Sequence, residues 1–163
     1  MEEKTFSELG RIEAIRLLFE GSGYTPFGEP LFFEAAGGDC VTTASRSLLE
    51  GMDFDLVYFP LKHLGYKSVI AVTGELYAVM AKPETLAVTM GVSAKLDFEQ
   101  IKEIWGGVVT AAKEHGYKAL SLELQPSKNG LCINLAASGR CSKLSAVRRP
   151  KAQSKDLICI SGR

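Results

Sequence analysis

The sequence lacks a net charge, a long apolar run and a basic leader. Its 163 residues carry 19 Lys and Arg against 19 Asp and Glu. No overall field therefore attracts a polyanion, and we expect neither DNA nor RNA as a partner. No stretch approaches the roughly 18 apolar residues of a membrane helix, and the acidic start MEEKTFSELG differs from a signal peptide. These absences predict a cytoplasmic protein without membrane contacts.

Cysteine pairs at metal-binding or redox spacing are also missing. The four cysteines, Cys40, Cys132, Cys141 and Cys159, show no CxxC spacing, and most of them stand in apolar runs. Zinc and disulfide chemistry are therefore not indicated. We expect buried, reduced thiols.

The chain does have enough apolar sequence for one globular domain. Hydrophobic residues make up 46% of it and charged residues 23%, which is typical of a domain with a full core. Apolar spacing predicts three helices, over 6–20, 61–79 and 97–115. Ser7 is the expected N-cap of the first helix and Asp97 that of the third, which Gly116 ends.

Runs of β-forming residues predict the strands. LFFEAA and CVTTASRSLLE flank a Gly-Gly-Asp turn and predict a hairpin, in which Asp39 serves the turn. TLAVTMGV predicts a single strand, and residues 117–124 and 131–137 predict a second hairpin. The polar, basic residues 138–156 are expected to form a loop, after which DLICIS begins another strand.

This order of elements predicts an α+β fold, with a mostly antiparallel four-stranded sheet and helices on one face. The strand segments CVTTASRSLLE, TLAVTMGV and LCINLAA have apolar residues on both faces. One apolar face would be left wet in a monomer, so we expect a homodimer that pairs through the sheet.

Four segments carry a resemblance that covers nearly the whole chain in register. They are FSELGRIEAIRLL, SLLEGMDFDL, LGYKSVIAVTGELYAVMAKPETLAVTMGV and RRPKAQSKDLICISGR. Together they resemble the N-terminal domain of thiamine-monophosphate kinase, in the aminoimidazole-ribonucleotide (AIR) synthetase-related superfamily. The resemblance implies an ATP-binding domain over 1–155, with 156–163 as the first strand of a truncated C-terminal domain. It also implies sheets that form a barrel across a homodimer.

The same resemblance implies that acidic loops hold magnesium, and this sequence alters those positions. The family's metal-binding Asp residues fall on Glu75, Glu123 and, on a strand, Arg46, while Asp53 replaces a His. Asp53 and Asp55 stand at alternate positions and could share a metal. The candidate magnesium ligands are therefore Glu75, Glu123, Asp53 and Asp55.

Four residues are candidates for contacts with the nucleotide: Glu29, Arg46, Lys67 and Arg149. Glu29 falls on the family's Gly-Asp-Asp, Lys67 matches a kinase lysine, and Arg149 lies in the basic loop. Each of these three is alternatively a solvated surface residue. Arg46 either offers a fixed positive charge to a phosphate or forms a salt bridge with Glu75 or Glu123, which would abolish the metal site.

Two functions follow from the sequence. The first is ATP- and magnesium-dependent phosphoryl transfer of the thiamine-monophosphate kinase type, expected only with the absent C-terminal domain. The second is a catalytically degenerate homologue that serves as a binding or dimerisation scaffold. Glutamate in place of aspartate keeps the charge but moves the carboxylate, and octahedral magnesium is exacting about ligand geometry. No catalytic residue is assigned, because neither His63 nor His115 has a Ser or Cys partner.

Overall fold

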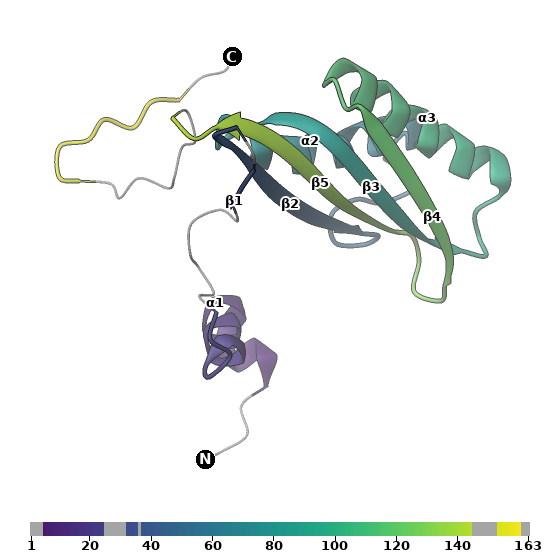
Figure 1. Cartoon of the computed structure of the whole chain (residues 1–163). Helices are drawn as coiled ribbons and strands as arrows, with labels where there is room; N and C mark the ends of the chain where they lie inside the picture. The colour runs from purple at the N-terminus through teal and green to yellow at the C-terminus, as the bar shows by residue number, and fades with distance from the viewer. Residues whose placement is uncertain (1–4, 25–31, 36, 145–152, 161–163) are drawn as a thin grey trace.

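The computed structural model describes residues 5–24, 32–35, 37–144 and 153–160. Within them the chain has the predicted α+β class, with three helices and five strands (Figure 1). In chain order these are α1 (Phe6–Phe19), β1 (Phe32–Glu34), β2 (Asp39–Leu49), α2 (Leu61–Tyr77), β3 (Lys82–Ser93), α3 (Phe98–Glu114), β4 (Ala119–Ser127) and β5 (Cys132–Ser142).

The strands form one open, mixed sheet in the order β1-β2-β5-β3-β4. β1–β2, β2–β5 and β5–β3 pair antiparallel, whereas β3–β4 pair in parallel. The first predicted hairpin, β1–β2, is confirmed. The second is wrong, because β5 lies between β2 and β3 and β4 pairs with the other edge of β3. A parallel pair needs a crossover connection, and α3 provides it between β3 and β4. The sheet therefore has five strands instead of the expected four, and β4 belongs to no hairpin.

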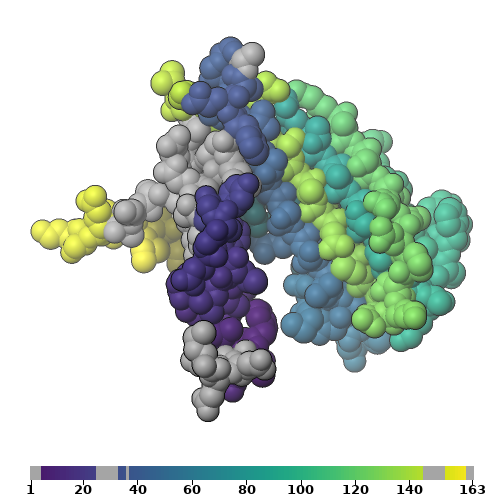
Figure 2. Space-filling view, turned by 60° about the horizontal axis from the view of Figure 1, so that its bottom comes forward, coloured from purple at the N-terminus to yellow at the C-terminus, as the bar shows by residue number. Residues whose placement is uncertain are grey.

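The two faces of the sheet differ in chemistry. Under α2 and α3 the side chains are apolar and buried: Leu48, Leu86, Val88, Met90, Ile133, Leu135 and Ala137. In the middle of the sheet, residues at the alternate positions are small or polar and mostly exposed: Thr43, Ser45, Ser47, Thr85, Ala87, Thr89, Asn134, Ala136 and Ser138. Nearer the ends of β2, the apolar Val41 and Leu49 share this face. Large apolar side chains, expected on both faces, are therefore missing from the middle of the open face. Figure 2 shows this open face, with β2, β5, β3 and β4 as neighbouring bands.

α2 and α3 lie against each other over one face of the sheet, with their backbones in contact at two glycines. A Cβ added to Gly65 would collide with the carbonyl oxygen of Ile104, and one added to Gly107 would collide with that of Lys62. Only glycine permits this approach. The contact closes a core whose largest members have no more than 2% of their surface exposed: Leu64, Val69, Val72, Leu76, Leu86, Val88, Met90, Ile104, Val108 and Ile133.

The ends of the helices agree with the predicted signals for α3 but not for α1. Asp97 Oδ1 accepts the Gln100 N–H at 2.8 Å at the start of α3, and Gly116 follows its end at φ 74°. At α1 the N-cap is Thr5 rather than Ser7, with the Thr5 N–H donating to the Glu8 carboxylate at 2.7 Å. The predicted third helix is thus confirmed at both ends.

α2 ends in the same kind of turn as α3, with a different residue at its left-handed position. Met80 occupies that position at φ 62°, and the Ala81 N–H donates to the Leu76 carbonyl at 2.9 Å. In α3 the equivalent bond joins Tyr117 N–H to the Ala112 carbonyl at 3.0 Å. Both helices therefore end in a Schellman turn, which satisfies their last carbonyls.

One expectation about the C-terminal third is corrected, and a second, the strand of a further domain, stays a prediction. β5 continues to Ser142, into the segment 138–156 that was expected to be a loop. The described part of the expected strand DLICIS, residues 156–160, has no regular secondary structure. Its Leu157, Ile158 and Ile160 side chains are at least 90% exposed.

The described helices include no candidate for a membrane span.

All four cysteines are free thiols, but only two are buried. Cys40 and Cys141 face each other across β2 and β5 under the helices. Burial raises the pKa of the Cys141 thiol. Cys132 is half-buried and Cys159 is exposed, so the expectation of buried thiols is wrong for Cys132 and Cys159.

Gly65→Ala and Gly107→Ala are each expected to lower the free energy of unfolding by about 1–3 kcal/mol, because the new methyl group must push the two helices apart. Gly106→Ala is the matched control on α3, where a Cβ would meet nothing within 4 Å. It should be neutral or stabilising by up to about 1 kcal/mol. Urea denaturation followed by circular dichroism measures all three. Equal losses at positions 106 and 107 would contradict the close-contact explanation.

Candidate functional site

Arg46 and Glu75 form an ion pair between β2 and α2. Arg46 lies opposite Leu135, whose side chain is buried beneath the helices, so Arg46 leaves the sheet on the helix side. Its Nη2 lies 3.0 Å from Glu75 Oε1, and the two side chains are 48% and 44% exposed. Of the two outcomes that the sequence allowed for Arg46, the structure shows the salt bridge.

Glu123 lies on the other side of the sheet. It stands opposite Thr89, which alternates with the buried Val88 and Met90 and therefore points away from the helices. The Glu123 carboxylate accepts a hydrogen bond from Gln125 Nε2 at 2.8 Å. The sheet itself thus separates Glu123 from Glu75.

Asp53 and Asp55 are hydrogen-bonded within the turn that follows β2. Asp53 Oδ2 accepts the Leu49 N–H at 2.8 Å, and Asp55 Oδ1 accepts the N–H two residues later, also at 2.8 Å. Lys67 approaches the same turn from α2. Its Nζ donates to the Asp53 carbonyl at 3.0 Å and lies 4.9 Å from the centroid of the Phe59 ring. These contacts tie α2 to the turn.

The four candidate magnesium ligands do not come together. Glu75 is paired with a cation, Glu123 lies across the sheet, and Asp53 and Asp55 each accept a backbone N–H. Among the described residues, no three His, Cys, Asp or Glu side chains form a group that could hold a metal ion. Magnesium requires oxygens at about 2.0–2.1 Å in near-octahedral geometry. This arrangement does not fit it.

Two candidate nucleotide contacts, Glu29 and Arg149, lie outside the described residues. The other two are placed on the α2 side of the sheet, where each already has a protein partner. Arg46 is bound to Glu75, and Lys67 to the turn after β2.

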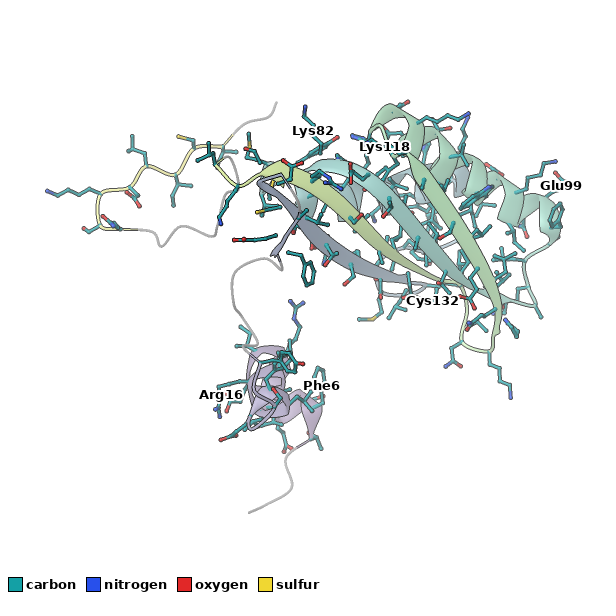
Figure 3. The ribbon with its side chains drawn as sticks, in the orientation of Figure 1. Phe6, Arg16, Lys82, Glu99, Lys118 and Cys132 are labelled. Carbon is teal, nitrogen blue, oxygen red and sulfur yellow. The ribbon has the colours of Figure 1, made fainter. Side chains whose placement is uncertain are left out.

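A cleft of about 660 Å³ lies at one end of the sheet, where α2 and α3 finish and β3 and β4 begin. Three cations line it: Lys82 at the start of β3, Lys118 just before β4, and Arg140 near the end of β5. Figure 3 shows Lys82 and Lys118 at this end and Cys132 at the opposite end. The rings of Tyr77 and His115, from the ends of α2 and α3, also line it.

Glu84 holds two of these cations in place. Its Oε1 accepts a hydrogen bond from Lys118 Nζ at 2.8 Å, and its Oε2 lies 3.3 Å from Arg140 Nε. Arg140 Nη1 also lies 3.7 Å from Asp39 Oδ2. The hydrogen bond from Lys118, with a further contribution from Arg140, lowers the pKa of Glu84 below its ordinary value.

Sequence reasoning missed this cleft. Asp39, Glu84, Lys118 and Arg140 come from separate parts of the chain and meet only through the pairing of the strands. The second hairpin, predicted wrongly, would have placed β4 beside β5, whereas β4 pairs with β3. The basic character of residues 138–156 was the one signal, and it pointed to a solvated loop rather than to the end of a strand.

No protein-family model matches the sequence, and no curated protein matches it at a significant level. Solved structures do match the fold. A ThiL complexed with AMPPCP and TMP superposes with a TM-score of 0.79 over 87% of this chain, at 16% identity. The thiamine-monophosphate kinase (ThiL) of Aquifex aeolicus gives 0.69 over 83% at 17% identity, and that of Stenotrophomonas maltophilia K279a gives 0.61 over 87% at 19% identity.

The fold of this chain is therefore similar to that of one part of these kinases. This likeness of fold agrees with the resemblance to thiamine-monophosphate kinase that the sequence segments carry. The chain spans only 44–45% of the length of these three kinases.

Glu84→Gln should destabilise the protein in a pH-dependent way. Its partners favour the ionised carboxylate, so the folded-state pKa lies below the unfolded value of about 4.3. The stabilisation is therefore present above that value and is lost as the pH falls through the folded-state pKa. We expect a deficit of up to about 1 kcal/mol at pH 7, because the side chains are partly solvated. Urea denaturation across the acid range measures it, and a deficit that persists at the acid end would contradict the ion-pair account.

Proposed function

We propose that this chain is an ATP-binding domain of the AIR synthetase-related type. The observation that carries the proposal is the match over 87% of the chain to a ThiL complexed with AMPPCP, an ATP analogue. Because the chain spans 45% of that protein, phosphoryl transfer is proposed only for this domain joined to a C-terminal domain. The boundary proposed from the sequence, with the second domain starting at residue 156, belongs to the same proposal.

Arg46 is the described residue best suited to meet a nucleotide phosphate on the α2 side. A guanidinium carries five N–H donors in a planar fork, and the ion pair with Glu75 is made through Nη2. About half of the Arg46 side chain is exposed, so other donors can reach a phosphate oxygen. Lys67, Glu29 and Arg149 remain proposed contacts.

The proposed binding of ATP does not use a magnesium ion held by the described residues. The resemblance implies the ion, yet the described carboxylates are separated by the sheet or held by Arg46 and by backbone N–H groups. We therefore expect ATP binding that depends little on magnesium. Arg46 would offer N–H donors to a phosphate oxygen, while its positive charge is shared with Glu75.

The Arg46–Glu75 ion pair also favours a second candidate, a catalytically degenerate homologue that serves as a binding scaffold. An arginine at that position neutralises the carboxylate that a metal would need. Phosphoryl transfer by the full-length protein that disappears in Glu75→Ala would contradict this candidate. A cytoplasmic location accompanies both candidates as a prediction from composition.

Isothermal titration of ATP into the chain tests the proposed function. We expect saturable binding that survives chelation of magnesium and is weakened by Arg46→Ala, because the guanidinium is the proposed phosphate contact. Glu99→Ala, which removes the ion pair with Lys102 on α3, is a control for loss of a surface ion pair and should not alter ATP affinity. Absence of heat and of any melting shift at millimolar ATP, with or without magnesium, would overturn the proposal.

A homodimer through the open sheet face is part of the proposed architecture. The side chains in the middle of this face are short and mostly polar, so pairing of two copies would rest on the close approach of their sheets. Ala87 and Ala136 lie opposite each other there and are exposed. Their substitution by lysine should set like charges against each other in a dimer.

Size-exclusion chromatography with light scattering checks this arrangement. The chain should elute with twice its own mass, and Ala87→Lys should shift it to the monomer. Gly106→Lys is the control, because it adds the same charge on α3 at a position with open space. A monomeric wild-type chain at micromolar concentration, or equal behaviour of the two variants, would contradict pairing through this face.

A further inference from the structure

We propose that the cleft at the ends of α2 and α3 binds a phosphate monoester, with its organic group against Tyr77 and His115. The cleft encloses about 660 Å³, within the range of small-molecule sites. It brings three cations and two aromatic rings to one place. The proposal is independent of ATP binding by the domain, because it concerns other residues and a simpler ligand.

The balance of charge favours an anion. Lys82, Lys118 and Arg140 face two carboxylates, Asp39 and Glu84, which leaves a formal excess of one positive charge. Lys118 and Arg140 are both tied to Glu84, at 2.8 and 3.3 Å, and so are held in position. For Lys82, no ion pair or hydrogen bond of its side chain is found among the described residues. Its Nζ is therefore the ammonium most open to a ligand.

Arg140 can turn part of its guanidinium to the ligand. Its Nη1 lies 3.7 Å from Asp39 Oδ2, longer than a charge-assisted hydrogen bond of about 2.7–2.9 Å. Lys82 is the strand partner of Arg140, so both side chains start from neighbouring points on β3 and β5. A phosphate group, with several acceptor oxygens, suits such a pair of cations better than a single carbonyl does.

The ends of the two helices supply the rest of the wall. Tyr77 Oη and His115 Nδ1 lie 2.9 Å apart, and the ring centroids are 5.7 Å apart at an interplanar angle of 52°. Helix C-termini normally repel anions. Here the Schellman turns at Met80 and Gly116 bond carbonyls of the last helical turns, so that the two rings and the cations are exposed to a ligand among the lining side chains.

Titration of the chain with phenyl phosphate and with inorganic phosphate, followed by amide NMR, tests the proposal. We expect saturable shifts confined to the amides of residues 115–118 and 140–142. Phenyl phosphate should bind more tightly than phosphate, because only the ester has a ring to place against Tyr77 and His115. Lys82→Ala should weaken both by up to about fivefold, as loss of one exposed charge contact does.

Lys128→Ala is the matched control, since it removes the same charge from the turn between β4 and β5, away from the cleft. Tyr77→Leu should lower the affinity for phenyl phosphate to that for phosphate. The proposal is overturned if the shifts do not saturate, or if Lys82→Ala and Lys128→Ala weaken binding equally. Phenyl phosphate binding in a chain that fails to bind ATP would leave the proposal standing and remove only the proposed function.

Discussion

The backbone contact between α2 and α3 is the constraint on which the rest of the structure depends. Gly65 and Gly107 let the helices approach until side chains are excluded between them. The pair then forms a single layer over the sheet, and the two helices end at the same level. Tyr77 and His115 meet across those ends only because the helices are held together so closely. The cleft wall is thus a consequence of two glycines that lie far from it.

The alternation of side chains along the strands decides which charges can meet. Arg46 shares the helix side with Glu75, whereas Glu123 follows the parity of Thr89 and lies on the open face. No rotation of a side chain can carry a carboxylate through a hydrogen-bonded sheet. The family resemblance placed Glu29, Glu75 and Glu123 at acidic positions. Of the two that are described, Glu75 belongs to α2 on the helix side of the sheet, and Glu123 lies on the open face. The resemblance is confirmed for the fold, and the site residues that it implies stay a prediction.

How much the sequence could predict follows from how local each signal is. The helix from Asp97 to Gly116 was predicted because its cap and its stop lie within the element itself. The β1–β2 hairpin was predicted because two glycines set its turn. The place of β4 could not be predicted, because parallel pairing with β3 depends on the crossover by α3 and on the insertion of β5. Glu84, Lys118 and Arg140 were missed for the same reason, since their meeting depends on that strand order.

The two charged regions differ in what they offer a phosphate. At Arg46 the positive charge is balanced by Glu75 at 3.0 Å, and both side chains are about half exposed, so the pair contributes little to folding and creates little excess field. At the cleft, three cations face two carboxylates, and Glu84 is ionised over a wider pH range because of its partners. The Glu84 carboxylate holds Lys118 and Arg140 in position but does not neutralise all three cations of the cleft. The described surface therefore carries a larger excess of positive charge at the cleft than at Arg46.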